Sequence, residues 1–501
     1  MIGRKIRILW LVGCMLALVR PGAAQEPMVL TLDRSIEIAL NQSNDIKQLE
    51  QSLISSRMNL RSAEAGFRSN GELQISSLPN FQQNERRTAL PGGTFLFERQ
   101  QFMDLQTDVL VNQPVGRTDG VFSLVGSLQR FQQFDVTDPV TNAASDPSQY
   151  GTQVRVQFRQ PLFTYNRLKV GLRRAELNLE TTLQTYSRNQ LDLVFNVTSG
   201  FYNLFKSQQQ LMLDQLQISQ AEEAFRIAQL KSAAGLLAEV EVLRLEIDLA
   251  NARNTMTNSE AALRQNEDSF KIQIGLPLES SIEVTTDLAY LPVNVPMERA
   301  IDEALKRRTE LRTDDIAIQL GEIGVTETDA QREIRGDLFV SYGLFNRRDR
   351  FQDAFNNFNN DRRVQLSVSV PLWDWSQNKY AVQAARANLE RDRLTRENRS
   401  NTIKQEIRTT VRNFESAEQR VEITRRSEEL ADKSYRIYFL RFENGEVSTQ
   451  DLALEQNRLA QARRNSLDAI IDYKQSLADL RRKTLWDFEK DEPVPVEVEE
   501  R

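Results

Sequence analysis

The stretch Gln160-Pro161-Leu162-Phe163 returns later in the chain as Val370-Pro371-Leu372-Trp373, displaced by 210 residues (371 − 161). This displacement holds without a gap for about ninety further positions. Upstream, Gly71-Glu72-Leu73 matches Gly336-Asp337-Leu338 at a displacement of 265 residues (336 − 71). The chain therefore contains two copies of one unit, and the first copy carries an insertion of 55 residues (265 − 210).

The composition argues against an enzyme, a metalloprotein and a nucleic-acid binder. The 501 residues include no histidine and one cysteine, and the formal net charge is −6. Most zinc sites and the serine and cysteine catalytic triads need histidine or cysteine side chains. The arginine-rich stretches are balanced by glutamate, which is typical of a solvated helix face. We therefore expect no catalytic site, no bound metal, no cofactor and no nucleic acid.

Residues 1–24 have the features of a secretory signal peptide. A basic start is followed by an apolar run from Ile8 to Val19 and by the small residues Gly22-Ala23-Ala24. An alternative interpretation takes Leu11-Val12-Gly13-Cys14 as a lipidation motif with Cys14 acylated. The apolar stretch before Cys14 is short and continues well beyond it, which favours cleavage after the small residues.

Each copy is expected to contain the same parts in the same order: a helix, a β-module and a long helical hairpin. The first long helix has about 67 residues and would be close to 100 Å long. The expected bounds are 25–296 for the first repeat (β-module 71–163, hairpin 166–274), 297–486 for the second (β-module 336–373, hairpin 377–486), and 487–501 for an acidic, disordered tail.

Alternation of apolar and polar residues predicts strands before each long helix. Every second residue from Val364 to Leu372 is apolar, whereas Gln365, Ser367 and Ser369 between them are polar. Such strands occur in an antiparallel sheet packed on helices, which is the simpler interpretation, and in a membrane β-barrel.

A second periodicity runs along the long helices. In the first, five apolar residues recur at spacings of three, four and seven: Val194, Val197, Phe201, Leu204 and Leu211. A seam with a period near 3.5 residues is typical of coiled-coil packing. A strand-rich end, very long helical hairpins, a secretion signal and no catalytic residues together indicate a conduit across the periplasm.

At this point the chain resembles the TolC-like outer-membrane efflux family, from about Leu30 to Trp486. The resemblance rests on the duplication, on the strand-to-helix junctions at Pro161 and Pro371, and on the helix turns at Gly235 and Gly445. It implies a mainly α fold with a β-barrel module. In a homotrimer, the long coiled-coil hairpins would form an α-barrel and the strands would join one transmembrane β-barrel.

The resemblance also implies a function and partners. Such a trimer would be a passive outer-membrane channel of a tripartite efflux or type I secretion system, embedded in outer-membrane lipid with a large periplasmic portion. Its periplasmic tip would open when a periplasmic adaptor and an inner-membrane transporter dock. The family pattern of two strands per repeat would give twelve strands in the trimer.

The helix turns would close the tip, and the family places carboxylates beside the second turn. Asp451 occupies that position, six residues after Gly445. The next family carboxylate falls on Leu454, with Glu455 adjacent, and the repeat partner of Asp451 is Glu241. Three copies around an axis would repel one another or bind cations. Alternatively, these are ordinary acids in the first turn of a helix.

Two alternatives and one open question accompany this hypothesis. A periplasmic coiled-coil adaptor or a structural coiled-coil protein would also carry long hairpins, but an adaptor normally has one hairpin and no duplication of the whole unit. The insertion in the first β-module is either an exposed hairpin or a pair of additional barrel strands.

Overall fold

The computed structural model describes residues 28–89, 92–93, 95–134, 136–137, 144–145 and 147–495. Contacts divide the chain into two compact units, each assembled from three segments. Of the described residues, the first unit contains 28–46, Asp192–Val293 and Arg412–Asp479, and the second contains Lys47–Leu191, Asn294–Val411 and 480–495. Signal-peptide and lipidation predictions, including the one for Cys14, fall outside the described residues.

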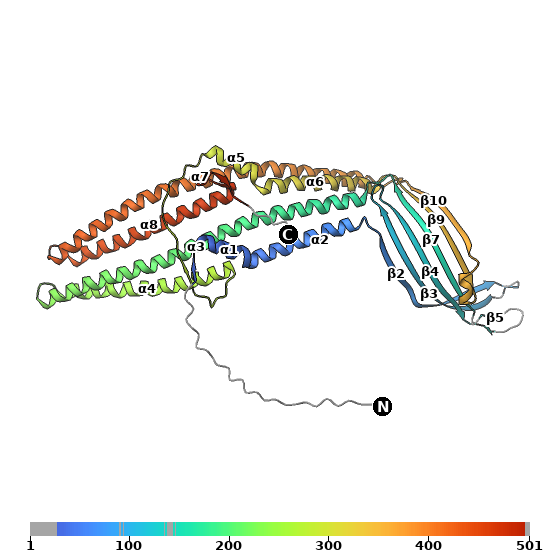
Figure 1. Ribbon diagram of the computed structural model, residues 1–501, viewed down its shortest axis with the longest axis horizontal. Helices are drawn as coiled ribbons and strands as arrows, with labels where there is room; N and C mark the ends of the chain where they lie inside the picture. The colour runs from blue at the N-terminus through green and yellow to red at the C-terminus, as the bar shows by residue number, and fades with distance from the viewer. Residues whose placement is uncertain are drawn as a thin grey trace, which may run out of the picture. The chain divides into compact units, whose positions relative to one another are not determined.

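The helices recur with the displacements found in the sequence (Figure 1). The two longest have 67 residues each: α3 (Arg167–Ala233) and α7 (Gln377–Glu443). Their returning partners have 36 each: α4 (Glu239–Ile274) and α8 (Thr449–Thr484). The shorter helices are α1 (Leu32–Gln42), α2 (Asn44–Ala65), α5 (Met297–Arg307) and α6 (Thr309–Asp329), with 3-10 turns η1 (Ala330–Arg332) and η2 (Phe351–Phe355).

The first helix of each copy, expected to be continuous, is broken in two. At Ser43 the backbone turns to φ −62° and ψ 148°, and the Ser43 hydroxyl caps α2 by accepting the Ile46 N–H at 3.2 Å. Arg308 makes the equivalent break between α5 and α6, with φ −64° and ψ 125°. A serine that competes for backbone hydrogen bonds favours such a boundary.

In the second unit, six antiparallel strands form one sheet in the order β10-β9-β7-β4-β3-β2. They are β2 (Asn70–Ala89), β3 (Phe95–Val115), β4 (Gly120–Phe134), β7 (Ser148–Leu162), β9 (Arg335–Arg348) and β10 (Asn359–Ser369). The remaining strands are short: β1 (Met28–Leu30) pairs with β8 (Ile282–Val284), β5 (Val136–Thr137) with β6 (Ala144–Ser145), and β11 (Trp486–Asp487) with β12 (Glu492–Pro493).

The insertion is a β-hairpin inside this sheet. At the displacements given by the sequence, β2 corresponds to β9 and β7 to β10, so β3 and β4 are the added strands. The expectation of two strands per repeat is therefore wrong for the first copy, which contributes four strands to the sheet. The reason is local: a tight turn at Asp119 (φ 62°) joins two strands that both alternate in polarity.

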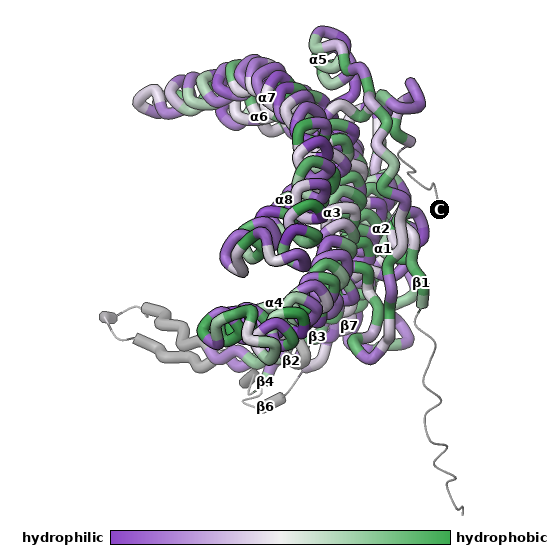
Figure 2. The backbone as a smooth tube through the Cα atoms, turned by 90° about the vertical axis from the view of Figure 1, so that its left-hand side faces the viewer, coloured by the Kyte–Doolittle hydropathy of each residue, from purple (hydrophilic) through white to green (hydrophobic). Residues whose placement is uncertain are grey.

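Apolar seams hold the helices of the first unit together. Val197, Phe201 and Leu204 of the predicted seam are fully buried. A second cluster gathers residues of four helices: Ala224, Ala228, Leu245, Tyr435, Phe442, Leu452 and Leu459. Burial of each large side chain stabilises the fold by about 1.5–3 kcal/mol. Hydrophilic and hydrophobic residues are interspersed along the helices (Figure 2), and no helix of the described residues is long and apolar enough to cross a bilayer.

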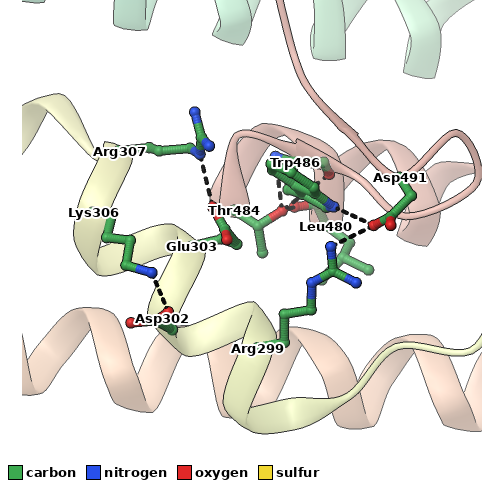
Figure 3. A network of polar contacts seen from close by, with 9 residues as sticks. All are labelled: Arg299, Asp302, Glu303, Lys306, Arg307, Leu480, Thr484, Trp486 and Asp491. Carbon is green, nitrogen blue, oxygen red and sulfur yellow. Dashed lines mark hydrogen bonds and ion pairs between the residues drawn. The ribbon is translucent and has the colours of Figure 1, made fainter.

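The C-terminal segment is anchored on α5 (Figure 3). The Trp486 ring lies between two guanidinium groups, 5.2 Å from Arg299 and 5.0 Å from Arg307. Asp491 accepts hydrogen bonds from Arg299 at 2.5 Å and from the Trp486 indole at 3.2 Å. The sequence predicts disorder from residue 487 to residue 501, of which the structure describes the part up to residue 495. In that part β11 and β12 are ordered instead, because cation–π contacts and hydrogen bonds fix the tryptophan.

Candidate functional site

Two regions are candidates for function: the helix turns of the first unit and the sheet of the second. At the turns, α3 and α7 are each followed, two residues after their last helical residue, by a glycine with positive φ, 73° at Gly235 and 81° at Gly445. After α7, the Gly445 N–H donates to Phe442 O at 3.0 Å and the Glu446 N–H donates to Arg441 O at 2.9 Å. This is the Schellman arrangement, which favours glycine because its φ is left-handed.

The two hairpins contact each other at these turns through two polar interactions. The Lys231 ammonium donates to Phe442 O and lies 4.5 Å from the centre of the Phe442 ring. The hydroxyl of Thr449, a fully buried residue, donates to the carboxylate of Glu241, which also pairs with Arg244 at 3.4 Å. Glu241 is therefore held between α4 and α8.

Asp451 is exposed and forms a capping box with Ser448. Its carboxylate accepts the Ser448 hydroxyl at 2.7 Å and the Ser448 N–H at 3.2 Å, while its own N–H donates to the Ser448 hydroxyl at 3.2 Å. These bonds, from the hydroxyl first and the backbone second, lower the pKa of Asp451 below its ordinary value. The carboxylate is thus ionised at neutral pH and remains accessible.

Glu455, the other candidate on α8, points toward α7. Only 5% of the residue is exposed, and its carboxylate accepts from Ser434 at 2.9 Å and from Arg458 at 2.5 Å. The neighbouring Leu454 is 50% exposed. Of the three candidate acids, Asp451 is therefore the one whose exposed carboxylate could face a pore. Its role in a gate stays a prediction.

Asp214 is a buried acid that the sequence reasoning missed. Only 1% of this residue is exposed, and it lies in the C-terminal half of α3. It accepts from Gln210 at 2.8 Å and Ser259 at 2.6 Å, and Arg464 lies 3.4 Å away. Asp214 follows Leu211 by three residues and therefore lies on the predicted apolar seam. This spacing could have identified it as a buried acid. A buried polar group in a coiled-coil seam specifies the register of the helices.

The sheet of the second unit has one apolar and one polar face. Val156 of β7 is paired with Leu124 of β4 and Tyr342 of β9. All three side chains lie on one face and are 46–51% exposed. The neighbouring residues Ser123 and Ser341 on the opposite face are 7% and 5% exposed. That face is mainly polar and has an open hollow of about 600 Å³ lined by residues such as Gln106, Ser127, Gln129, Gln153, Arg347 and Asp361.

Aromatic side chains flank the apolar face at both ends. At the strand-to-helix end, where Pro161 and Pro371 lie, three aromatic residues are 68–89% exposed: Phe163, Trp373 and Trp375. At the opposite end, Tyr150 packs edge-on against Phe351, with ring centres 5.6 Å apart, and Phe351 packs against Phe355. An apolar band between two aromatic girdles is the pattern of a β-sheet that spans a membrane.

Within the described ranges, no group of three or more histidine, cysteine, aspartate or glutamate side chains could hold a metal ion. Long paired hairpins and a two-faced sheet with an exposed apolar face define a channel-type protein of the outer membrane. The chain belongs to the outer membrane efflux protein family, whose model matches residues 132–275 and 300–484. It is accordingly an outer-membrane protein with a large periplasmic portion, and the family consists of channels rather than enzymes.

Individual relatives are distant in sequence and similar in fold. Protein CyaE of Bordetella pertussis is 22% identical over 236 residues, which cover 46% of this chain and 48% of CyaE; the chain thus matches about half the length of this relative. The CmeC outer membrane channel of Campylobacter jejuni superposes with a TM-score of 0.68 at 13% identity, covering 93% of this chain and 87% of CmeC. The outer membrane protein VceC of Vibrio cholerae gives 0.66 at 11% identity, covering 93% and 97%. At these identities the structural likeness is one of fold alone.

Proposed function

We propose that this protein is the outer-membrane channel of a tripartite efflux or type I secretion system, a passive conduit through which an inner-membrane transporter exports its cargo. The observation that carries the proposal is the sheet of the second unit. Its apolar face is exposed, its polar face is hollowed, and its two outer strands have edges without a partner in the described chain.

The open edges support a closed oligomer. β10 is exposed along its length, with Val364 at 76% and Leu366 at 60%. An exposed apolar edge strand invites pairing with another strand, and a sheet at membrane depth needs every edge closed. If β10 of one chain pairs with β2 of the next, three chains close a barrel with lipid outside and water inside. Members of the family act as trimers, which favours this number of chains.

The helix turns of the first unit supply the gate. In a trimer, three copies of Asp451 approach a common axis and, being ionised, repel one another or bind cations. The contacts Lys231–Phe442 and Thr449–Glu241 join the two hairpins and oppose their separation. Docking of a periplasmic adaptor and the inner-membrane transporter then separates the hairpins and opens the tip.

Fractionation and planar bilayers test the proposal. We expect detergent-resistant trimers in the outer membrane that form single channels in a bilayer. A monomer found soluble in the periplasm, without channel activity, would contradict the proposal. It would instead support a periplasmic adaptor or a structural coiled-coil protein, neither of which needs an exposed apolar sheet face.

A further inference from the structure

The inserted hairpin forms part of the wall of the sheet. β3 pairs with β2 along most of its length and with β4 from Gln101 to Val115, and β4 pairs with β7 from Val121 to Gln132. No ladder joins β2 directly to β7. If β3 and β4 were removed, β2 and β7 would be separated by a gap two strands wide and would have to move together to pair.

Both faces of the hairpin match the faces of the flanking strands. Val109, Val111 and Leu124 lie on the apolar face and are 40–51% exposed. On the polar face, Gln129 donates to Asp104 at 2.8 Å and Gln106 donates to Asp108 at 2.9 Å. A hairpin that projected into water from the membrane surface would not need one apolar face and one polar face.

We infer that the insertion widens the outer-membrane pore, so that three chains close a barrel of about eighteen strands and pass a hydrated polypeptide as cargo. The inference rests on the proposed channel function. With strands about 4.8 Å apart and tilted by about 40°, eighteen strands give a barrel about 36 Å across between backbones, whereas twelve give about 24 Å. Barrels of about eighteen strands hold an open aqueous channel.

The helices of the same unit match this width. Besides the short α5 and the end of α8, four long helical segments accompany the sheet in the second unit: α2, α6 and the first parts of α3 and α7. Side by side, four helices span about 32–40 Å, since packed helices lie about 8–10 Å apart. Six tilted strands span about 38 Å. Six strands per chain are therefore as wide as the four helices, whereas four strands would be narrower and would constrict the channel at the sheet.

The chemistry of the polar face indicates the class of cargo. The added strands contribute the acids Asp104 and Asp108, whereas β7 and β10 contribute Arg155, Arg159 and Arg363. A wet lining with charges of both signs does not reject either sign, unlike a ring of one sign. It suits a polypeptide, which carries both, better than a small apolar compound.

Single cysteines test the width and the wall separately. Ser127→Cys places a thiol on the polar face of the inserted hairpin, and Val109→Cys places one on its apolar face. Trimers in outer membranes are treated with a small maleimide and with a polymer-linked maleimide. The polymer is chosen to pass the free lumen of an eighteen-strand barrel but not that of a twelve-strand barrel, each lumen being narrower than the backbone width because side chains point inward. Gln365→Cys and Leu366→Cys in β10 are the matched controls, because β10 lies in the wall for either strand count.

We expect both reagents to label most Ser127→Cys chains and neither to label Val109→Cys before detergent is added. Equal labelling of the two variants would overturn the inference, since the hairpin would then be a water-exposed loop. If the small reagent labels Ser127→Cys and the polymer does not, the inference of an eighteen-strand width is wrong. A failure of the channel proposal itself would give a different result. Leu366→Cys would then be labelled by maleimide as well, because β10 would not face lipid.

Discussion

The Thr449 hydroxyl donates a hydrogen bond to the Glu241 carboxylate, although the two residues are 208 positions apart in sequence. The bond joins the first turn of α8 to the first turn of α4. It therefore connects the two hairpins beside the turns that are expected to close the channel. An interaction present only while the hairpins are together stabilises the closed state relative to the open one.

Thr449→Val should make the channel easier to open. Valine keeps the shape of threonine and removes the donor, which costs the closed state about 1 kcal/mol in each chain and raises the open-to-closed ratio about fivefold for each pair of hairpins that separates. Single-channel recordings in planar bilayers measure that ratio. Thr449→Ser restores the donor and should behave like the unmodified chain. A Thr449→Val channel with unchanged opening would show that the bond has no part in the gate.

Asp451→Asn should raise single-channel conductance and weaken blockade by multivalent cations. The substitution removes three negative charges from the trimer and keeps an oxygen that can accept the Ser448 hydrogen bonds. Conductance and the blocking concentration of a trivalent cation in planar bilayers are the measurements. Unchanged values would leave Asp451 as a helix cap only.

Ser448→Ala is the matched control for that experiment, because it breaks the capping box and keeps the Asp451 charge. The loss of an N-cap serine costs about 1 kcal/mol of stability. We expect a lower unfolding temperature with cation blockade unchanged. If Ser448→Ala reproduces the conductance of Asp451→Asn, the effect comes from a disturbed helix start rather than from charge.

Periodicity was sufficient to predict the helical seam, the strands and the turn glycines. Val197, Phe201 and Leu204 are buried as a 3.5-residue period requires, and Gly235 and Gly445 have the positive φ that a helix end with glycine favours. These features depend on residues close together in sequence. Local spacing therefore contains the information that fixes them.

Pairing order and side-chain direction could be predicted only in part. Alternation identifies β3 and β4 as strands but does not say which neighbours they pair with, since every alternating strand offers the same two faces. Glu455 follows Leu452 by three residues and precedes Leu459 by four, so it lies on the buried seam of α8. That spacing predicts an inward direction, which differs from the direction of the adjacent Leu454, where the family has its second carboxylate.

Gly275→Ala should destabilise the protein more than Gly445→Ala, although both glycines have φ near +80°. At Gly445 an added Cβ meets nothing within 4 Å, so only the left-handed backbone is strained, at a cost of about 1 kcal/mol. At Gly275 the Cβ would lie 2.6 Å from Gln42 O, and relief of that clash costs about 1–3 kcal/mol more. Denaturant unfolding followed by circular dichroism measures both. Equal losses would mean that α1 moves away freely.

Glu406 of α7 is held by two cations in the second unit. Its carboxylate accepts from Arg308 at 2.5 Å and lies 3.5 Å from Lys483. Partial burial acts to raise the pKa of Glu406, but the hydrogen bond and charge of Arg308, followed by those of Lys483, outweigh it, and the net pKa is lowered. The folded state therefore binds the Glu406 proton less tightly than the unfolded state does.

Glu406→Gln should consequently reduce stability at neutral pH and have little effect in acid. A carboxyl whose pKa is lowered by folding stabilises the protein above its unfolded pKa, and that contribution is lost as pH falls through the folded value. We expect a loss of about 1 kcal/mol at pH 7, because solvent screens the partly exposed pair. Unfolding temperatures of both chains between pH 7 and pH 3 measure the difference. Arg308→Gln is the matched control: with its main cation removed, the Glu406 contribution at pH 7 should shrink. A loss that stays constant down to pH 3 would show that packing, and not the charge of Glu406, is responsible.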